Sequence, residues 1–324
     1  MSGLPAWISA ALQDGLENVS RAALRERARV ISDRYRSGGS SGIIASDLDA
    51  LAYAVVRMPA TFAALHAALE QVIAVVPAFA PQSVLDVGAG PGTATWAATE
   101  AWPTLRRVTL VDSNPHLLAL AKQLQGSAIT SGIDVSAVQM DISASLTGAH
   151  PAELIMASYV LGELSASQFD DVLAQLWSLT SQALVIVEPG TPAGFQRILH
   201  CRKMLLAWGA QLIAPCSHDG ICPLAASGRW CHFGARLPRS RDHQTVKQAF
   251  VPYEDEKFSY LAAGKGFSDI ERGRRILATP KITKAAIALS LCAPGKVDER
   301  VILRRQKDAY RAAKRHGWGD AINL

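Results

Sequence analysis

The sequence has no run of about 18 uncharged apolar residues, the length that a transmembrane helix needs, and its best such stretch, Val72–Pro81, is far shorter. It has no basic-then-apolar segment at the start either, because Asp14 and Glu17 interrupt the first residues. We therefore expect no membrane partner and no signal or transit peptide, and we predict a cytoplasmic protein of bacterial type. Disorder is excluded because 49% of the residues are hydrophobic and the net charge is only +5.

Cysteine is absent from the first 200 residues, and all five cysteines follow: Cys201, Cys216, Cys222, Cys231 and Cys292. Disulfides are rare in a cytosolic chain, so clustered thiols indicate a metal site or catalysis. Cys201 falls in a predicted helix over 194–208, and we expect it in the core rather than at a metal.

Positive charge is scarce in residues 1–200, which carry 11 Lys and Arg against 17 Asp and Glu. Residues 201–324 carry 22 against 11, so the basic residues are concentrated in the C-terminal third. This asymmetry favours a polyanionic partner, with a solvated charged surface as the alternative.

The apolar spacing predicts two kinds of structure along the chain. Residues 5–78 have the three- and four-residue spacing of helices, over 6–16, 20–35 and 47–75. From Pro81, short apolar strands alternate with helices, and the strands are expected at 83–87, 107–112, 135–140, 154–158 and 183–188. This alternation predicts an α/β fold with a parallel, doubly wound sheet. A late hairpin, 285–292 and 300–304, is expected to supply the antiparallel edge that closes this sheet.

A glycine-rich turn, Asp86-Val-Gly-Ala-Gly-Pro-Gly92, follows the first predicted strand. Its glycines, Gly88, Gly90 and Gly92, depart from the G-x-G-x-x-G spacing of a dinucleotide site. The acid Asp86 suits the ammonium and sulfonium of S-adenosylmethionine (SAM) better than a pyrophosphate.

Two further acids follow the next predicted strands. Asp112 ends the second strand and is placed to accept both ribose hydroxyls of SAM, and Asp141 follows the third and is placed to contact the adenine amino group. The segment after the fourth strand has neither the Asn/Asp-Pro-Pro-Tyr tetrad nor the Pro-Cys nucleophile of base methyltransferases. Tyr159 or Glu163 could face a substrate there. SAM binding is thus predicted from the residues, whereas methyl transfer is an inference and the catalytic residues are unknown.

Three thiols, Cys216, Cys222 and Cys231, lie within sixteen residues that also contain Pro and Gly, and Cys292 could join them from the late hairpin. Zinc usually takes a C-x2–4-C knuckle, which this cluster lacks, whereas a [4Fe–4S] cluster takes four thiolates. His218 and His232 could complete a zinc site without Cys292. The spacing alone leaves iron–sulfur and zinc open.

Several rare segments occur in one order along the chain: Glu188–Gly194, Ala214–His218, Cys222–Leu224, Trp230–Phe233, Tyr253–Tyr260 and Trp318–Asp320. Together they resemble the methyltransferase-like assembly factors of the mitochondrial small ribosomal subunit and their bacterial relatives. The resemblance implies a Rossmann-like, seven-stranded SAM-dependent methyltransferase core and association with small-subunit ribosomal RNA (rRNA). It also implies a [4Fe–4S] site on four cysteines, which would be Cys216, Cys222, Cys231 and Cys292.

These observations predict four parts: an N-terminal helical region (1–79), a SAM-binding core (80–210), a Cys-rich iron–sulfur and RNA-binding insert (211–265), and the closing hairpin with a basic tail (266–324). The basic C-terminal third would bind rRNA, through Arg236–Arg241 and the tail 304–315, and no DNA partner is expected. Tyr253 and Tyr260 are candidates to stack on bases, although aromatic residues at such spacing more often lie in the core. We expect the acids 254–256 to pair with nearby arginines.

The alternatives are an active methyltransferase of a small molecule or protein with structural zinc, and a non-catalytic rRNA-binding assembly factor.

Overall fold

The computed structural model describes residues 3–36, 41–127, 132–247, 250–267 and 270–323. Its N-terminal part consists of three helices, α1 (Ala6–Leu16), α2 (Arg21–Arg36) and α3 (Asp47–Val75), as the spacing predicts, with a 3-10 turn, η1 (Ser41–Ile43), before α3. The side chain of Ser46 caps α3 by accepting a hydrogen bond from the Asp49 N–H at 3.2 Å.

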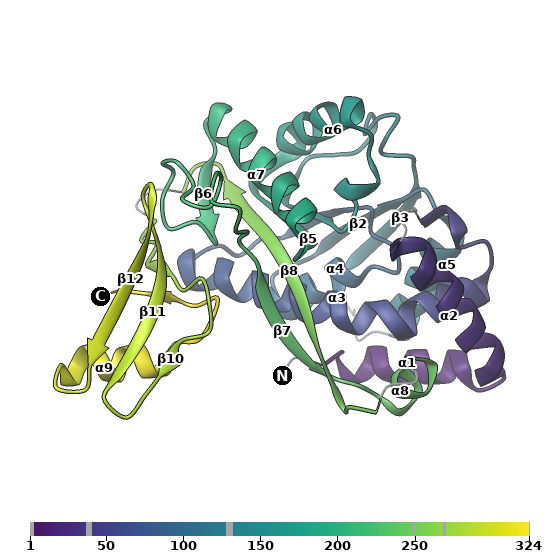
Figure 1. Cartoon of the computed structure of the whole chain (residues 1–324). Helices are drawn as coiled ribbons and strands as arrows, with labels where there is room; N and C mark the ends of the chain where they lie inside the picture. The colour runs from purple at the N-terminus through teal and green to yellow at the C-terminus, as the bar shows by residue number, and fades with distance from the viewer. Residues whose placement is uncertain (1–2, 37–40, 128–131, 248–249, 268–269, 324) are drawn as a thin grey trace.

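Among the described residues, helix α3 is the one helix whose length and composition would allow it to cross a membrane. It is longer than the apolar stretch 72–81 considered from the sequence. Of its most apolar window, 72% is buried inside the protein. Figure 1 shows α3 running along one face of the central sheet, and it contacts β5, β6, β7 and β8 of that sheet. Its apolar surface is therefore that of a core helix.

The central sheet is built from strands on both sides of residue 200: β1 (Ser83–Val87), β2 (Arg107–Asp112), β3 (Asp134–Gln139), β4 (Ala152–Ser158), β5 (Thr180–Pro189), β6 (Gln211–Ala214), β7 (Phe233–Pro238) and β8 (Tyr253–Gly264). Seven of them lie in the order β3-β2-β1-β4-β5-β8-β6, and β7 pairs with β8 as an eighth. The first five are parallel, and β8 is antiparallel to β5, β6 and β7. The predicted Rossmann-like, seven-stranded α/β core is confirmed.

The connecting helices are α4 (Thr93–Ala101), α5 (Pro115–Ser127), α6 (Ala166–Leu179), α7 (Pro192–Ala207) and α8 (Arg241–Lys247), with a 3-10 turn, η2 (Leu161–Glu163), after β4. Helices cover both faces of the sheet. Along β5, Val185 and Val187 join the core on the α3 face, whereas Leu184 and Ile186 join the core on the α6 and α7 face. This explains why β5 has a continuous run of buried apolar residues over 183–187.

The late hairpin does not close the central sheet, so that prediction is wrong. Its strands, β11 (Ala286–Ala293) and β12 (Lys296–Leu303), form a separate three-stranded sheet with β10 (Lys281–Ile282), seen at one side of the molecule in Figure 1. Helix α9 (Lys307–Arg315) packs on it, and two short strands, β9 (Arg274–Arg275) and β13 (Ala321–Ile322), pair beside it.

Burial explains which strand takes the closing position. In β11 buried residues alternate with half-buried ones, as in a sheet that is covered on one face. In β8 every residue from Phe258 to Gly264 is buried, as a strand covered on both faces requires. Strands β6, β7 and β8 all fall within the predicted insert 211–265, whereas the loop 215–232 and helix α8 lie outside the sheet.

The end of β1 is tied to α4 by Asp86. This buried carboxylate accepts hydrogen bonds from the Thr95 N–H and the Thr95 Oγ1, both at 2.9 Å through Oδ2. Burial raises the pKa of Asp86 to about 7, against the opposing effect of the Thr95 hydrogen bonds. The turn between β1 and α4 is thus anchored by the Asp86 side chain, whose pKa lies near neutral pH.

Because the pKa of Asp86 rises from 3.8 to about 7 on folding, its contribution to stability is greatest below about pH 4 and is lost as the pH rises through about 7. An Asp86→Asn variant keeps the acceptor oxygen but cannot titrate. We expect the wild type to lose unfolding free energy relative to this variant as the pH rises across that window. Urea denaturation at intervals from about pH 5 to about pH 8 measures the difference. A difference independent of pH would contradict the buried, titrating Asp86.

Candidate functional site

A cavity of about 890 Å³, called the large cavity below, opens at the carboxyl ends of the parallel strands. In a doubly wound sheet this edge is where ligands bind. Gly88 and Gly90 follow β1, Asp112 ends β2, and Asp141 follows β3, and all four line the cavity. The structure therefore brings these four predicted residues together.

Two glycines of the turn are needed for geometric reasons. Gly88 has φ of +69°, and a Cβ there would come within 2.4 Å of the Val160 side chain. Gly90 has φ of +54°, and a Cβ there would meet only Leu117, at 3.9 Å. Because Gly90 lines the cavity, its missing side chain leaves room for a ligand against the backbone.

Asp112 anchors this turn from the neighbouring strand. Its Oδ2 accepts a hydrogen bond from the Gly90 N–H at 2.7 Å, and its Oδ1 accepts one from the Asn114 N–H at 2.8 Å. Burial raises the pKa of Asp112, while these backbone hydrogen bonds oppose the rise. Each carboxylate oxygen keeps a second lone pair, so Asp112 can still accept hydrogen bonds from the hydroxyls of a ligand.

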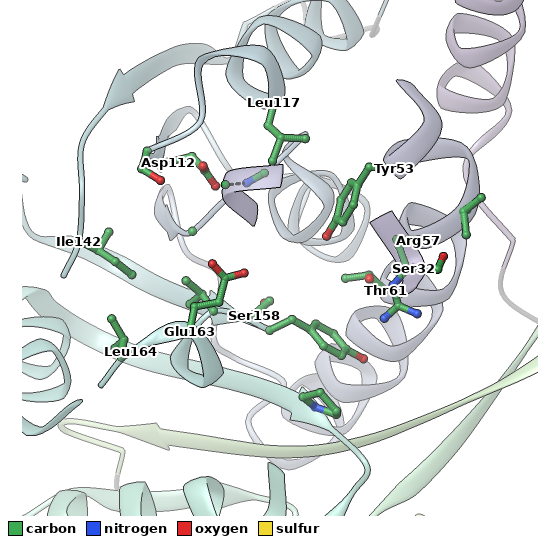
Figure 2. A pocket seen from close by; sticks show the side chains of 18 of the residues that line it. Ser32, Tyr53, Arg57, Thr61, Asp112, Leu117, Ile142, Ser158, Glu163 and Leu164 are labelled. Atoms are coloured by element: carbon green, nitrogen blue, oxygen red, sulfur yellow. Dashed lines mark hydrogen bonds between the residues drawn. The ribbon is translucent and has the colours of Figure 1, made fainter. Parts of the chain in front are cut away.

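The same end of the large cavity has an apolar wall. Met140, Ile142 and Leu117 line it, and Figure 2 shows Leu117 and Ile142 near Asp112. Asp141, between Met140 and Ile142, accepts hydrogen bonds through Oδ1 from the Ser143 N–H at 2.9 Å and Oγ at 2.7 Å. An acid flanked by apolar side chains suits a flat heteroaromatic ring with an amino group.

Two of the six predicted cofactor residues do not line the large cavity. Asp86 points beneath the turn to Thr95, as described above. Gly92 has φ of +78° and precedes the first residue of α4. Both therefore shape the turn rather than face the cavity.

The other end of the large cavity consists of residues that the sequence analysis mostly missed. Tyr53 and Arg57 come from α3, and Glu256 from β8 (Figure 2 labels the first two). Glu256 accepts a hydrogen bond from the Tyr159 hydroxyl at 3.3 Å and lies 3.8 Å from Arg57. Burial raises the pKa of both Tyr159 and Glu256. The sequence signal that could have identified this end of the cavity is the pair of polar residues Tyr53 and Arg57, which lie one turn apart in a largely apolar helix.

Tyr159 and Glu163, the two candidates for the substrate side, both line the large cavity. Tyr159 has φ of +58° and is the one non-glycine residue in the left-handed region within the described chain. Such a conformation in an aromatic residue is unfavourable and persists only where the surroundings hold it. The segment after β4 is therefore constrained to present Tyr159 at the junction of the two ends.

The four predicted metal ligands surround a second, small cavity of about 40 Å³, called the cysteine cavity below; they are Cys216, Cys222, Cys231 and Cys292. Cys201 is fully buried in the core and does not line it, which confirms its predicted place. His218 Nε2 lies 3.7 Å from Cys292 Sγ, but neither predicted histidine lines the cavity. Among the described residues, no three His, Cys, Asp or Glu side chains are arranged as ligands of one metal ion.

The four cysteines of the cysteine cavity are half-buried. Burial raises the pKa of Cys216 and Cys231, and it raises the pKa of Cys292 to about 11. The positive charges of Arg202 and Arg275 oppose this rise at Cys216. Without a bound cation the thiols of Cys216, Cys231 and Cys292 are therefore protonated at neutral pH.

The acids of β8 pair with basic residues, as predicted. Asp255 lies 2.6 Å from Arg236 and Glu254 lies 3.1 Å from Arg239 across the β7–β8 pair. Of the two places considered for Tyr260, the structure shows the core, because Tyr260 is buried beside Phe258 and is not available to stack on bases.

Exposed cations gather instead around α9 in the basic tail: Arg304, Arg305, Lys307, Arg311, Lys314 and Arg315. Tyr253 is exposed, with the Arg236 guanidinium 4.3 Å from its ring centroid.

Comparison with known proteins identifies relatives of the chain. The human mitochondrial ribosome assembly protein METTL17 is 28% identical over 291 residues, which cover 84% of this chain and 62% of the relative. The mitochondrial Rsm22-cox11 tandem protein 2 of Schizosaccharomyces pombe is 25% identical over 338 residues, which cover 86% of this chain and 44% of the relative. The chain thus spans less than two thirds of the length of these curated relatives.

Among solved structures, magnesium protoporphyrin IX methyltransferase from Synechocystis PCC 6803 with bound SAM is similar to this chain with a TM-score of 0.44 and 12% identity. That match covers 82% of this chain and all of the other.

The prediction of a cytoplasmic protein is contradicted, because the relatives are mitochondrial proteins. That prediction used Asp14 and Glu17 as evidence against a targeting segment. Asp14 lies within α1 and Glu17 follows it, and Ile8 and Leu16 of this helix are buried in the core. These acids belong to the folded domain, so they carry no information on targeting.

The model of one protein family, described as mitochondrial small ribosomal subunit Rsm22, matches residues 47–323. The match includes the glycine turn, the acids of the large cavity and all four cysteines of the cysteine cavity. It confirms the resemblance to methyltransferase-like factors of the small ribosomal subunit. The chain belongs to the mitochondrial small ribosomal subunit Rsm22 family.

Proposed function

We propose that this protein binds SAM in the large cavity and acts as a methyltransferase-like assembly factor of the small ribosomal subunit. The observation that carries the proposal is the convergence of Gly88, Gly90, Asp112 and Asp141 on one cavity in a chain of the Rsm22 family. The name of the human relative, a ribosome assembly protein, supports the ribosomal part.

The chemistry of the large cavity fits SAM. Among its carboxylates, those of Asp112, Asp141 and Glu163 suit a ligand with an ammonium and a sulfonium. Asp112 would accept the ribose hydroxyls, Asp141 the adenine amino group, and Gly90 would let the ligand approach the backbone. When bound, SAM supplies an electrophilic methyl group.

We propose that Cys216, Cys222, Cys231 and Cys292 hold a [4Fe–4S] cluster in the cysteine cavity. The donor set fits, because four thiols and no carboxylate line it. The spacing of the four cysteines lacks the C-x2–4-C knuckle that zinc usually takes, which favours the cluster over zinc. Zinc stays the second candidate, since His218 lies beside Cys292.

We propose that rRNA binds to the basic tail rather than to Arg236–Arg241. Arg236 and Arg239 of that run are paired with acids, so their charges are largely compensated. The exposed cations of α9 have the density that a phosphate backbone requires. In this proposal SAM binds to the core 80–210 and RNA to the tail of the part 266–324, so the insert 211–265 loses the RNA-binding role predicted for it.

An active methyltransferase is the second candidate function. It is favoured by the extent of the large cavity, which continues past the proposed SAM residues to Tyr53, Arg57 and Glu256. This end leaves space for a methyl acceptor beside Tyr159. Transfer of a radiolabelled methyl group from SAM to small-subunit RNA or protein would favour the enzyme, and tight SAM binding without transfer would favour the assembly factor.

Replacing Asp112 by Ala should weaken SAM binding, because hydrogen bonds to a charged acceptor contribute about 1.5–3 kcal/mol each. Loss of the ribose contacts should lower the affinity by about tenfold or more. Isothermal titration calorimetry measures it, with Asp134→Ala as the control because Asp134 starts β3 at the opposite edge of the sheet. Unchanged affinity in Asp112→Ala would remove the SAM assignment.

Reversing two charges of the tail, Lys314→Glu with Arg315→Glu, should weaken binding to small-subunit rRNA. Each lost phosphate contact should lower the slope of log affinity against log salt by about one. The matched control is Arg107→Glu with Lys122→Glu, two exposed cations of the acidic part. Equal effects of the two double variants, or wild-type binding that is insensitive to salt, would contradict the assignment of this surface.

Single Cys→Ser changes at the four cysteines of the cysteine cavity should each lose iron and increase proteolysis within 215–240, because the loop has no core of its own. Cys201→Ser, the control, should do neither. Iron, sulfide and zinc assays on anaerobically purified protein give the readout. Colourless protein with about one zinc per chain would reject the cluster but keep the metal site.

A further inference from the structure

Two arginines, Arg202 on α7 and Arg275 on β9, line the cysteine cavity together with the four cysteines. They are almost completely buried, with 7% and 2% of their surface exposed. A buried guanidinium normally lies against a carboxylate, because an unpaired charge away from water is strongly unfavourable. The partners of these two side chains therefore show whether their positive charges are compensated.

Arg275 is surrounded by neutral acceptors. Its Nε donates to the Pro215 carbonyl oxygen at 2.9 Å, and its Nη1 donates to the Gly319 carbonyl oxygen at 2.7 Å and to Gln71 Oε1. No carboxylate of the described residues lies within ion-pair distance. The hydrogen bonds orient this guanidinium toward the cavity but leave its charge uncompensated.

Arg202 is in the same situation. Its Nη2 donates to the carbonyl oxygens of His218 and Gly220 at 3.0 and 2.6 Å, and its Nε is buried without a hydrogen-bond partner in the described structure. The nearby carboxylate of Asp219 is taken by Arg272, with hydrogen bonds of 2.7 and 3.0 Å. Arg202 therefore carries a second uncompensated charge to the same cavity.

The neighbouring arginines follow the ordinary pattern. Arg272 pairs with Asp219, and Arg274, next to Arg275 in β9, lies 2.5 Å from Asp298. The two arginines that lack an acid among the described residues of this region are the two that face the cysteines. This correlation points to the cysteine site as the source of the missing negative charge.

We propose that Arg202 and Arg275 are the charge partners of the cysteine site in its metal-loaded form. This inference rests on the proposed function, because it needs a metal group held by the four cysteines. Thiols lose their protons when they bind metal, so four thiolates around an oxidised [4Fe–4S] core leave the site doubly negative. Two guanidiniums balance that charge.

The proposal fixes the sign of two effects. An added electron makes the cluster more negative, and nearby positive charge stabilises that state, so removing either arginine should make the reduction potential more negative. The same arginines should stabilise the loaded protein against unfolding and destabilise the metal-free protein, because only the loaded form supplies their counter-charge.

The test compares Arg202→Gln and Arg275→Gln with the wild type in two forms, loaded under anaerobic conditions and stripped with a chelator. We expect both variants to lower the midpoint of thermal unfolding more in the loaded form than in the stripped form, and to shift the potential to more negative values. Arg272→Gln is the matched control, since it removes a guanidinium of the same region that already has an acid partner.

Equal losses of stability in the two forms, with an unchanged potential, would overturn the proposal and leave the arginines a purely structural role. Where a Gln variant does not fold, the variants Arg202→Lys and Arg275→Lys test the proposal instead, because lysine keeps the positive charge. Retained metal and a wild-type reduction potential would support charge compensation, and loss of metal in both variants would contradict it. Wild-type protein that binds neither iron nor zinc would instead contradict the proposed function. A loaded wild type with insensitive variants contradicts this inference alone.

Discussion

Strand β8 is the constraint on which both candidate sites depend. It pairs with β5, β6 and β7, so its position is fixed by hydrogen bonds along both edges. Glu256 near its start lines the large cavity, and Tyr260 lines the cysteine cavity about 13 Å further along the strand, four residues at the usual rise. Between them, Ser259 Oγ donates to the Cys231 carbonyl oxygen at 2.7 Å and ties the cysteine loop to the sheet. The two sites are thus held at a fixed spacing by one buried strand.

The two cavities have opposite electrostatic character. The large cavity has the carboxylates of Asp112 and Asp141 at the end where we place SAM, which suits a cationic ligand. The cysteine cavity has two buried guanidiniums and thiols whose pKa values are raised by burial. It therefore suits a negatively charged centre that forms only when a metal removes the thiol protons.

The sequence predicted most of the helices and parallel strands because their signals are local. The short buried strand β1, the glycine turn and the ends of β2 and α3 can each be recognised within a short window. The position of the β11–β12 hairpin could not be predicted in this way. Its turn and its alternating burial specify that the two strands pair, but they do not specify which sheet the strands join. The burial of β8 on both faces decided that question, and it depends on helices distant in the sequence.

The same limit applies to the sites. Asp112 and Asp141 were found because strand ends meet at one edge of a parallel sheet. Tyr53 and Glu256 were missed, because nothing in the sequence says that α3 and β8 meet across the cavity. The role expected of Arg236 and Arg239 changed for a related reason, since their pairing with Asp255 and Glu254 follows from the β7–β8 register.

The central claim is that the glycine turn and its acids form a SAM site, and photo-crosslinking tests it most directly. Protein irradiated with methyl-labelled SAM, digested and mapped should carry the label on the peptides that contain Gly88–Gly90, Asp112 or Met140–Ile142. Unlabelled SAM in excess should abolish the signal. Label on peptides remote from the large cavity, or no competable label at saturating SAM, would contradict the account.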